Sequence, residues 1–206
     1  MSQRLQVHPL NPQPRLIRQA AELIRKGGLV VYPTDSGYAF GWHIGDRDAA
    51  ERLQRIRQTG KDHNFTLVCR DLSEIATYAR IDNPTYRLLR AHTPGAYTFI
   101  LRATREVPRR LQNPKQQTVG IRVPDHPVPL ALLAELGEPL MSSSLILPDH
   151  ELPLADPDDI HDALAGRIDL LIDSGNCGLD PTTVVDLTSD LPRVLRQGRG
   201  DASVFA

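Results

Sequence analysis

The chain alternates between segments whose apolar residues recur at helical spacing and short segments that are apolar throughout. Residues 15–26 (RLIRQAAELIRK) carry apolar side chains three and four positions apart and stop at Gly27 and Gly28, which predicts a helix ended by glycine. The run Leu29–Tyr32 is short and apolar and is closed by Pro33, so we expect a buried strand there.

The same two patterns continue to the end of the sequence. Further helices are predicted to begin at Asn83 and to span 46–58, 73–79, 125–136 and 157–165, with Ser73, Asn83 and Asp125 as N-caps. Further strands are predicted over 65–69, 97–103, 118–123, 140–144, 169–172, 183–186 and 193–196. This alternation predicts an α/β fold with a twisted, open, mixed sheet, in one domain over residues 1–206 whose core spans about 16–198.

The net charge of −1 conceals two oppositely charged portions of the chain. Residues 52–122 hold 14 Lys/Arg against 5 Asp/Glu, whereas residues 125–190 hold 1 against 14. Such segregation fits an anionic partner for the basic portion. It fits equally a fold in which the two portions face each other and partly cancel, and the sequence leaves both open.

Several classes of protein are disfavoured by what the sequence lacks. There is no run of eighteen apolar residues and no signal-peptide centre, so we expect a cytoplasmic protein without a membrane segment. Cys69 and Cys177 lie far apart, which favours two buried, reduced thiols over a disulfide. No metal site is predicted, because the seven histidines show no ligand spacing. The motifs GxxxxGK[ST], GxGxxG after a strand and GxSxG are also missing.

Three polar clusters remain at or near the ends of predicted strands. They are Thr34–Gly37 (TDSG), Ser142–Ser144, and Arg122, which alternates with apolar neighbours. Each has an ordinary explanation: a turn, capping hydroxyls and a solvent-exposed strand arginine, respectively. Because ligands of open α/β sheets bind at strand ends, the clusters are also candidates for a binding site.

Six segments lie in order along the chain as candidate motifs: VVYPTDSGYAFG (30–41), TPGAYTFIL (93–101), VGIRVPDHP (119–127), PLMSSS (139–144), TTVVDL (182–187) and VLRQG (194–198). Together they resemble the YrdC/YciO-like family, whose best-known members are threonylcarbamoyl-AMP synthases, and the resemblance runs from about Leu16 to Gly198. The segments RIRQ, HNFTL, VPRRL and SLILP resemble the YciO-like branch more closely.

The resemblance implies a YrdC-like fold with a concave basic face and a cleft for L-threonine and ATP. The implied reaction converts L-threonine, bicarbonate and ATP into threonylcarbamoyl-AMP and pyrophosphate, in the pathway to N6-threonylcarbamoyladenosine of tRNA. Mg²⁺ would serve as the counter-ion of ATP, with no tightly bound metal. Double-stranded RNA or tRNA is the implied macromolecular partner.

The resemblance also implies site residues, carried over one by one. Threonine would be bound by Thr34, His63, Arg122 and Ser142, with the Arg122 fork on its carboxylate. The nucleotide would be bound by Arg57, Thr59, Ser144, Thr182 and Arg196, and of these Arg57 and Ser144 would be catalytic.

Two motifs of the synthases are altered in this chain. The K-x-R pair reads Arg57-Gln58-Thr59 and the S-x-N pair reads Ser144-Leu145-Ile146, so only the serine is kept. Loss of one positioned polar group at a charged transition state costs ~10²–10³ in rate. We therefore expect a weak or altered synthase.

Two other functions stay open. One is an RNA-binding module without synthase activity, which would recognise a duplex by shape and phosphate contacts because aromatic residues make up only 5%. The other is a nucleotide or acylphosphate hydrolase, for which no general base is recognisable.

Overall fold

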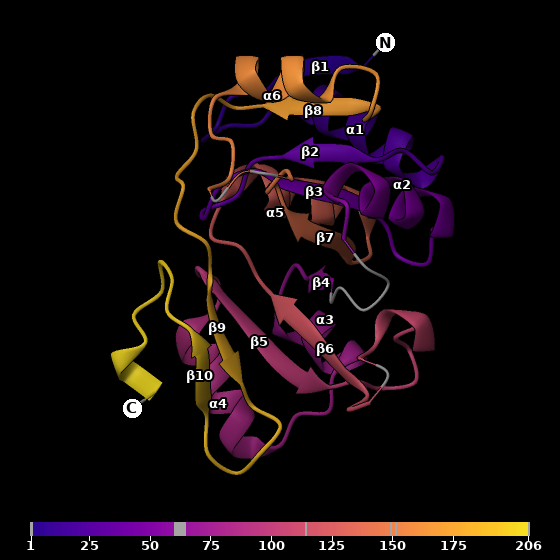
Figure 1. The fold of residues 1–206 in the computed structure, drawn as a ribbon. Helices are drawn as coiled ribbons and strands as arrows, with labels where there is room; N and C mark the ends of the chain where they lie inside the picture. The colour runs from indigo at the N-terminus through magenta and orange to yellow at the C-terminus, as the bar shows by residue number, and fades with distance from the viewer. Residues whose placement is uncertain (1, 60–64, 114, 149, 151, 206) are drawn as a thin grey trace.

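Ten strands join one twisted sheet in the computed structural model, which describes residues 2–59, 65–113, 115–148, 150 and 152–205. In chain order they are β1 (Gln3–Gln6), β2 (Val30–Tyr32), β3 (Ala39–His43), β4 (Thr66–Val68), β5 (Tyr97–Arg102), β6 (Thr118–Arg122), β7 (Leu140–Ser144), β8 (Leu170–Asp173), β9 (Thr183–Asp186) and β10 (Arg193–Arg196). Across the sheet the order is β1-β8-β2-β3-β7-β4-β6-β5-β9-β10, so that β1 and β10 form the two edges (Figure 1).

Strand directions in the sheet are mixed, as the sequence predicts. The pairs β1/β8, β8/β2, β4/β6 and β5/β9 are parallel. The pairs β2/β3, β3/β7, β7/β4, β6/β5 and β9/β10 are antiparallel. The predicted fold class, a twisted open mixed α/β sheet, is therefore confirmed.

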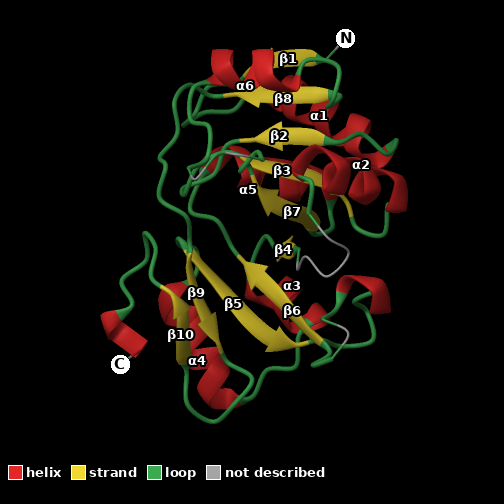
Figure 2. Cartoon of the chain, in the orientation of Figure 1, coloured by secondary structure: helices red, strands yellow, loops and turns green. Residues whose placement is uncertain are grey.

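Helices lie on both faces of the upper part of the sheet, whereas none of the described α-helices covers the face of β5, β6, β9 and β10 that is turned to the viewer in Figure 2. The described residues form α1 (Pro14–Arg25), α2 (Arg47–Arg57), α3 (Leu72–Tyr78), α4 (Asn83–His92), α5 (Pro127–Leu136) and α6 (Pro157–Leu164), with 3₁₀ turns η1 (Arg109–Leu111) and η2 (Ser203–Phe205). None of these helices is long and apolar enough to cross a membrane.

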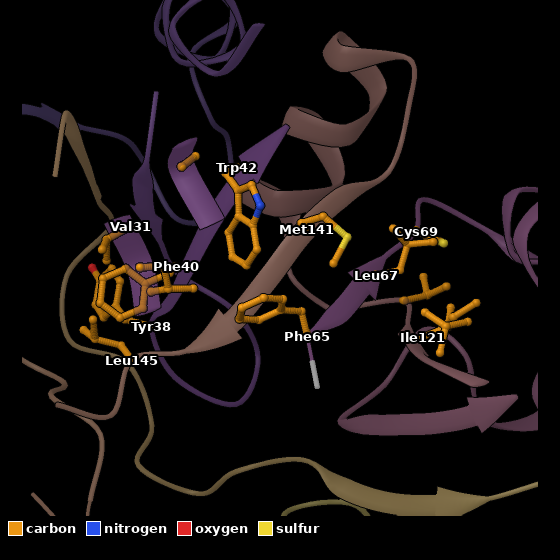
Figure 3. Close-up of a cluster of buried hydrophobic side chains, with 14 of the residues drawn as sticks. Val31, Tyr38, Phe40, Trp42, Phe65, Leu67, Cys69, Ile121, Met141 and Leu145 are labelled. Atoms are coloured by element: carbon orange, nitrogen blue, oxygen red, sulfur yellow. The ribbon is translucent and has the colours of Figure 1, made fainter. Parts of the chain in front are cut away.

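Alternate strand residues belong to two separate hydrophobic clusters, because successive side chains of a strand point to opposite faces of the sheet. Val30 and Tyr32 pack with α1 and α5 in one cluster. Val31, between them, belongs to the other cluster, to which α2, α3, α4 and α6 contribute. Figure 3 shows part of this second cluster, where Trp42 meets Phe65 edge to face with ring centroids 4.9 Å apart.

Strands β1 and β3 are not among the elements that the sequence predicts. β1 is a polar edge strand that pairs only with β8, so it carries no apolar signal. β3 contains Gly41, which breaks a strand pattern. The structure explains this glycine, because a Cβ there would lie 2.7 Å from Leu140 Cδ2 and 2.9 Å from Tyr32 Cε1.

All three predicted N-caps are wrong by one or two residues. Asp71 caps α3 by accepting from Glu74 N at 2.9 Å, and Asp82 caps α4 by accepting from Thr85 N at 2.8 Å. Aspartate, serine and asparagine are about equally good N-caps, so residue type alone does not distinguish Asp71 and Asp82 from the neighbouring Ser73 and Asn83. At α5 the cap is His126, whose Nδ1 accepts from Val128 N at 3.2 Å.

Both cysteines are free thiols, as expected, but only Cys69 is fully buried. Burial raises the pKa of Cys69 well above its ordinary value. Cys177 is partly exposed, so the expectation of two buried thiols is wrong for it, and burial still raises its pKa to about 11. Both sulfurs therefore stay protonated at neutral pH, which disfavours a nucleophilic role.

Candidate ligand-binding site

A cavity of about 440 Å³ is lined by residues of β4, β5, β6, β9 and β10 and of the end of β7. All of these strands except β7 lie in the lower part of the sheet in Figure 1. The floor of the cavity consists of alternate residues, which share a face: 98 and 100, 118, 120 and 122, and 184 and 186. Sites for small molecules span roughly 300–1,000 Å³, so this cavity has the size of such a site.

The wall of the cavity combines positively charged and apolar side chains. Its described residues include four arginines and one carboxylate: Arg57, Arg122, Arg193, Arg196 and Asp186. The apolar side chains in the wall are Ala39, Phe65, Ile100, Leu111, Val119, Ile146, Val184 and Leu195. The combination favours a ligand with an anionic part and an apolar part.

Ser142 offers the cavity an acceptor and no donor. Its hydroxyl donates to Phe40 O at 2.9 Å and lies 2.8 Å from the hydroxyl of Tyr32. Because a serine has a single hydroxyl hydrogen, Tyr32 is the donor in that second contact. Burial raises the pKa of Tyr32 to about 12, so this donor stays protonated. One lone pair of Ser142 is left for a donor on the ligand.

Arg122 is buried, with 7% of its surface exposed, so the ordinary explanation of an exposed strand arginine is wrong. Its Nη2 forms an ion pair with Asp35, and its Nη1 donates to Ser36 Oγ at 3.0 Å. Its Nε is buried without a hydrogen-bond partner. A buried donor without a partner is costly, and an acceptor on a ligand that reached it would remove that cost.

Arg57 extends from the end of α2 to the loop after β7. Its Nε donates to Ile146 O at 3.1 Å and its Nη1 donates to Ser143 Oγ. Burial of the side chain lowers the pKa of Arg57 from its ordinary value. The guanidinium thus holds the serine segment in place at the same time as it lines the cavity with Ser144.

Arg196 lies on the opposite side of the cavity, on edge strand β10. Its Nη2 and Nε donate to Thr182 O at 2.8 and 3.1 Å, and Thr182 Oγ1 lies 2.8 Å from Thr98 Oγ1. Among the described residues no carboxylate forms an ion pair with it, and burial lowers its pKa. A half-buried cation of this kind is suited to an anionic ligand group.

The Thr34–Gly37 segment is a tight turn outside the cavity wall. Thr34 Oγ1 donates to Gly37 O at 2.6 Å and accepts from Ser36 N at 3.1 Å and from the Ser36 hydroxyl at 3.2 Å. The donor and both lone pairs of Thr34 are therefore in use. Gly37 has φ +121°, and a Cβ there would lie 2.8 Å from Gly178 O, so the turn requires glycine.

The structure brings six of the nine residues proposed for the site to one cavity: Arg57, Arg122, Ser142, Ser144, Thr182 and Arg196. Thr34 and Thr59 lie outside its wall, and the hydroxyl of Thr59 is buried without a partner. His63 falls outside the described residues. Its proposed role, like the roles of the other eight, stays a prediction.

Asp186 and Arg193 line the cavity but are not among the proposed residues. Arg193 Nη2 lies 3.3 Å from Asp186 Oδ2, and Thr188 donates to Oδ1 through its N and its hydroxyl. Burial opposes ionisation of Asp186, but these hydrogen bonds outweigh it and lower its pKa. The signal in the sequence was the alternation of Thr182, Val184 and Asp186, which puts Val184 and Asp186 on one face of β9 together with Thr182 just before the strand.

Comparison with known proteins supports the resemblance found in the sequence. The Sua5/YciO/YrdC family model, described as telomere recombination, matches residues 22–198. The uncharacterized protein YciO of Escherichia coli is 56% identical over 205 residues, covering 100% of both chains. Its crystal structure matches with a TM-score of 0.96 and 55% identity over the full length of both chains. The assignment to the YciO-like branch is thus confirmed.

The synthases are more distant. The threonylcarbamoyl-AMP synthase of Bacillus subtilis is 30% identical over 184 residues, which make up 88% of this chain and 53% of that protein. The crystal structure of P. abyssi Sua5 complexed with L-threonine matches with a TM-score of 0.86 and 26% identity, covering 95% of this chain and 57% of Sua5. From the family match over most of its length, we conclude that this chain belongs to the Sua5/YciO/YrdC family.

Proposed function

We propose that this protein is a threonylcarbamoyl-AMP synthase-like nucleotidyltransferase with weak or altered activity. The observation that carries the proposal is the buried Arg122 Nε, a donor without a partner in the wall of the same cavity as Ser142, which offers only an acceptor. An α-amino acid such as L-threonine supplies the complementary groups, since its carboxylate accepts and its ammonium donates. That a related Sua5 structure holds L-threonine supports the choice of ligand.

ATP would occupy the side of the cavity between Arg57 and Arg196. Formation of threonylcarbamoyl-AMP joins a carbamate oxygen to the α-phosphorus and expels pyrophosphate, so negative charge must be stabilised on phosphate oxygens. Arg196 and Arg57 would supply that stabilisation, and apolar residues such as Ile100 and Leu195 would contact the nucleoside. Mg²⁺ would arrive with ATP, and Asp186 is the carboxylate among the described wall residues that could meet it.

Two features of the wall would weaken the reaction. Arg57 already donates to Ile146 O and Ser143, so its guanidinium is constrained by the protein. Ile146 presents hydrocarbon where the synthases carry an amide, and it offers the transition state no hydrogen bond. We therefore propose that the cavity binds threonine and ATP but that formation of the adenylate is slow.

The test is to incubate the protein with labelled ATP, L-threonine, bicarbonate and Mg²⁺ and to separate the products. Slow formation of threonylcarbamoyl-AMP, dependent on all the substrates, is the expected result. Binding of L-threonine and ATP should be measured separately by calorimetry. If neither ligand binds at millimolar concentration, the proposal is wrong.

A second candidate function is binding of double-stranded RNA or tRNA. The observation that favours it is a group of exposed arginines in the basic portion of the chain, namely Arg80, Arg87, Arg90 and Arg105. Among the described residues no carboxylate forms an ion pair with any of the four. Unpaired guanidinium groups are suited to phosphate contacts, which bind a duplex with little dependence on sequence.

A further inference from the structure

The Thr34–Gly37 turn holds Arg122 from outside the cavity. Asp35 Oδ1 accepts from Arg122 Nη2, and its Oδ2 accepts from Asp125 N at 3.2 Å. Ser36 accepts from Nη1 at 3.0 Å. The side chains of Asp35 and Arg122 are each only 9% exposed, and neither Asp35 nor Ser36 lines the cavity. The turn thus contacts the arginine and not the space that a ligand would fill.

We propose that Asp35 is a positioning residue that fixes the Arg122 guanidinium with its Nε–H directed to an acceptor on the bound ligand. The inference rests on the proposed function, under which that acceptor is an oxygen of L-threonine. Asp35 and Ser36 engage the two terminal nitrogens from neighbouring positions of one rigid turn, which defines the plane of the guanidinium. Nε is then the one guanidinium nitrogen without a partner in the described residues.

Positioning of this kind matters because arginine has many rotamers. A guanidinium that is held before the ligand arrives loses little further conformational freedom on binding. The Asp35 carboxylate also offsets the cost of burying the cation. Asp35 Oδ2 also accepts a hydrogen bond from Asp125 N, three residues after the end of β6. This bond links the Thr34–Gly37 turn to the segment that follows the strand bearing Arg122.

The substitution Asp35→Asn tests the proposal, because it keeps the size of the side chain and one acceptor but removes the charge. The first measurement is hydrogen exchange of the Arg122 Nε–H by NMR, assigned with Arg122→Lys, which needs no ligand. We expect slow exchange in the wild type and at least roughly tenfold faster exchange in Asp35→Asn. The second measurement is calorimetry with L-threonine and with ATP. We expect threonine affinity to fall at least roughly tenfold and ATP affinity to change less than about twofold.

Matched variants separate positioning from general damage. Asp71→Asn makes the same substitution at the N-cap of α3, and we expect it to change neither the exchange rate of the Arg122 Nε–H nor the ligand affinities. Ser36→Ala removes the Nη1 acceptor, together with the hydroxyl contact to Thr34, and keeps the Asp35 carboxylate. It should change the exchange rate and the threonine affinity in the same direction as Asp35→Asn, but by less. The proposal is overturned if Asp35→Asn folds but its Arg122 Nε–H exchanges at the wild-type rate. It is also overturned if the substitution lowers the affinity for ATP as much as the affinity for L-threonine.

The two proposals fail in different ways. If the wild type binds no threonine, the proposed function fails, but the exchange measurement still decides whether Asp35 fixes Arg122. If threonine binds equally well to wild type and Asp35→Asn, the proposed function stands and the positioning role falls.

Discussion

The hydroxyl of Tyr32 donates a hydrogen bond to Ser142 Oγ at 2.8 Å, and the Ser142 hydroxyl donates to Phe40 O. This relay joins β2, β7 and β3 beneath the cavity and sets Ser142 as an acceptor. Tyr32 is fully buried, so the bond forms away from bulk water.

Tyr32→Phe should lower the free energy of unfolding by about 1 kcal/mol, the usual net value of one buried hydrogen bond. The measurement is urea denaturation followed by tryptophan fluorescence. Tyr86→Phe is the control, because Tyr86 is exposed, and it should stay within about 0.5 kcal/mol of the wild type. Equal stabilities for the two variants would contradict the relay.

The buried pair Asp35–Arg122 should show strong energetic coupling. Arg122→Met leaves the Asp35 carboxylate buried without its cation, and breaking such a pair costs about 3–5 kcal/mol. Adding Asp35→Asn removes that unpaired charge, so the double variant should lose clearly less than the sum of the two single losses. The check is a double-mutant cycle of unfolding free energies. Additive losses would show that the ion pair makes no net contribution.

His126 should make stability depend on pH. Burial lowers its pKa below the ordinary value, although the carboxylates of Asp35 and Asp125 act in the opposite direction. The unfolded chain then binds the proton more readily than the folded one. Stability is complete above the unfolded pKa of about 6.5 and is lost as pH falls through the folded pKa. Neutral Nδ1 is also the cap acceptor for α5.

His126→Asn keeps an N-cap acceptor and removes the titration. The stability advantage of wild type over this variant should therefore be greatest near pH 8 and shrink toward pH 5. Denaturant unfolding at several pH values measures it. A difference between wild type and His126→Asn that stays constant over this pH range would refute the prediction.

Binding to duplex RNA, if the second candidate function holds, should be steeply salt-dependent. Arg87→Gln with Arg90→Gln removes two exposed cations from α4, and the slope of log affinity against log salt should fall by about two. The matched control is Arg15→Gln with Arg18→Gln, which makes the same charge change outside the basic portion. Filter binding measures both pairs. Equal effects of both pairs, or no wild-type binding at low salt, would exclude this surface.

The sequence predicts those elements whose signal is local. Apolar spacing and flanking glycines identify α1 and β2, and alternation identifies β6 and β9. β3 was missed because it is buried on both faces and so shows no alternation, and because its glycine is needed by Leu140 and Tyr32, which come from distant segments. β1 was missed because a polar strand acquires its role only from its partner β8.

The same limit applies to the site. Arg122 could be recognised as a candidate from its place in a strand, but its burial depends on Asp35, 87 positions away. Thr34 looks from the sequence like a ligand contact, whereas the turn uses all of its hydrogen-bonding capacity. Three-dimensional neighbours decide which hydrogen-bonding groups are already in use. Sequence alone therefore cannot distinguish a turn with groups available to a ligand from a turn that holds a neighbouring side chain.

Arg57 is the point at which this wall differs most clearly from the synthase motifs. It reaches across from α2 to Ile146 O and Ser143, and so joins two altered motifs that are about ninety residues apart in sequence. A lysine has a single compact cation and would be freer to follow a phosphate. Arg57 and Ile146 thus form one local arrangement, and Thr59 follows Arg57 by two residues in the same altered motif. The three positions should therefore be changed together.

The combination Arg57→Lys, Thr59→Arg and Ile146→Asn should raise the rate of threonylcarbamoyl-AMP formation at least roughly tenfold over the wild type. The change restores a mobile cation, a second guanidinium and an amide, and groups that act as a unit give non-additive effects. Each single variant should therefore recover much less.

Adenylate formation is measured under identical concentrations of threonine, bicarbonate, ATP and Mg²⁺, with Ile146→Val as a control that keeps the wall apolar. A wild type as fast as a vigorous synthase would refute the role given to these positions. A folded triple variant without gain would show that the cavity has diverged beyond them, and would favour the RNA-binding function.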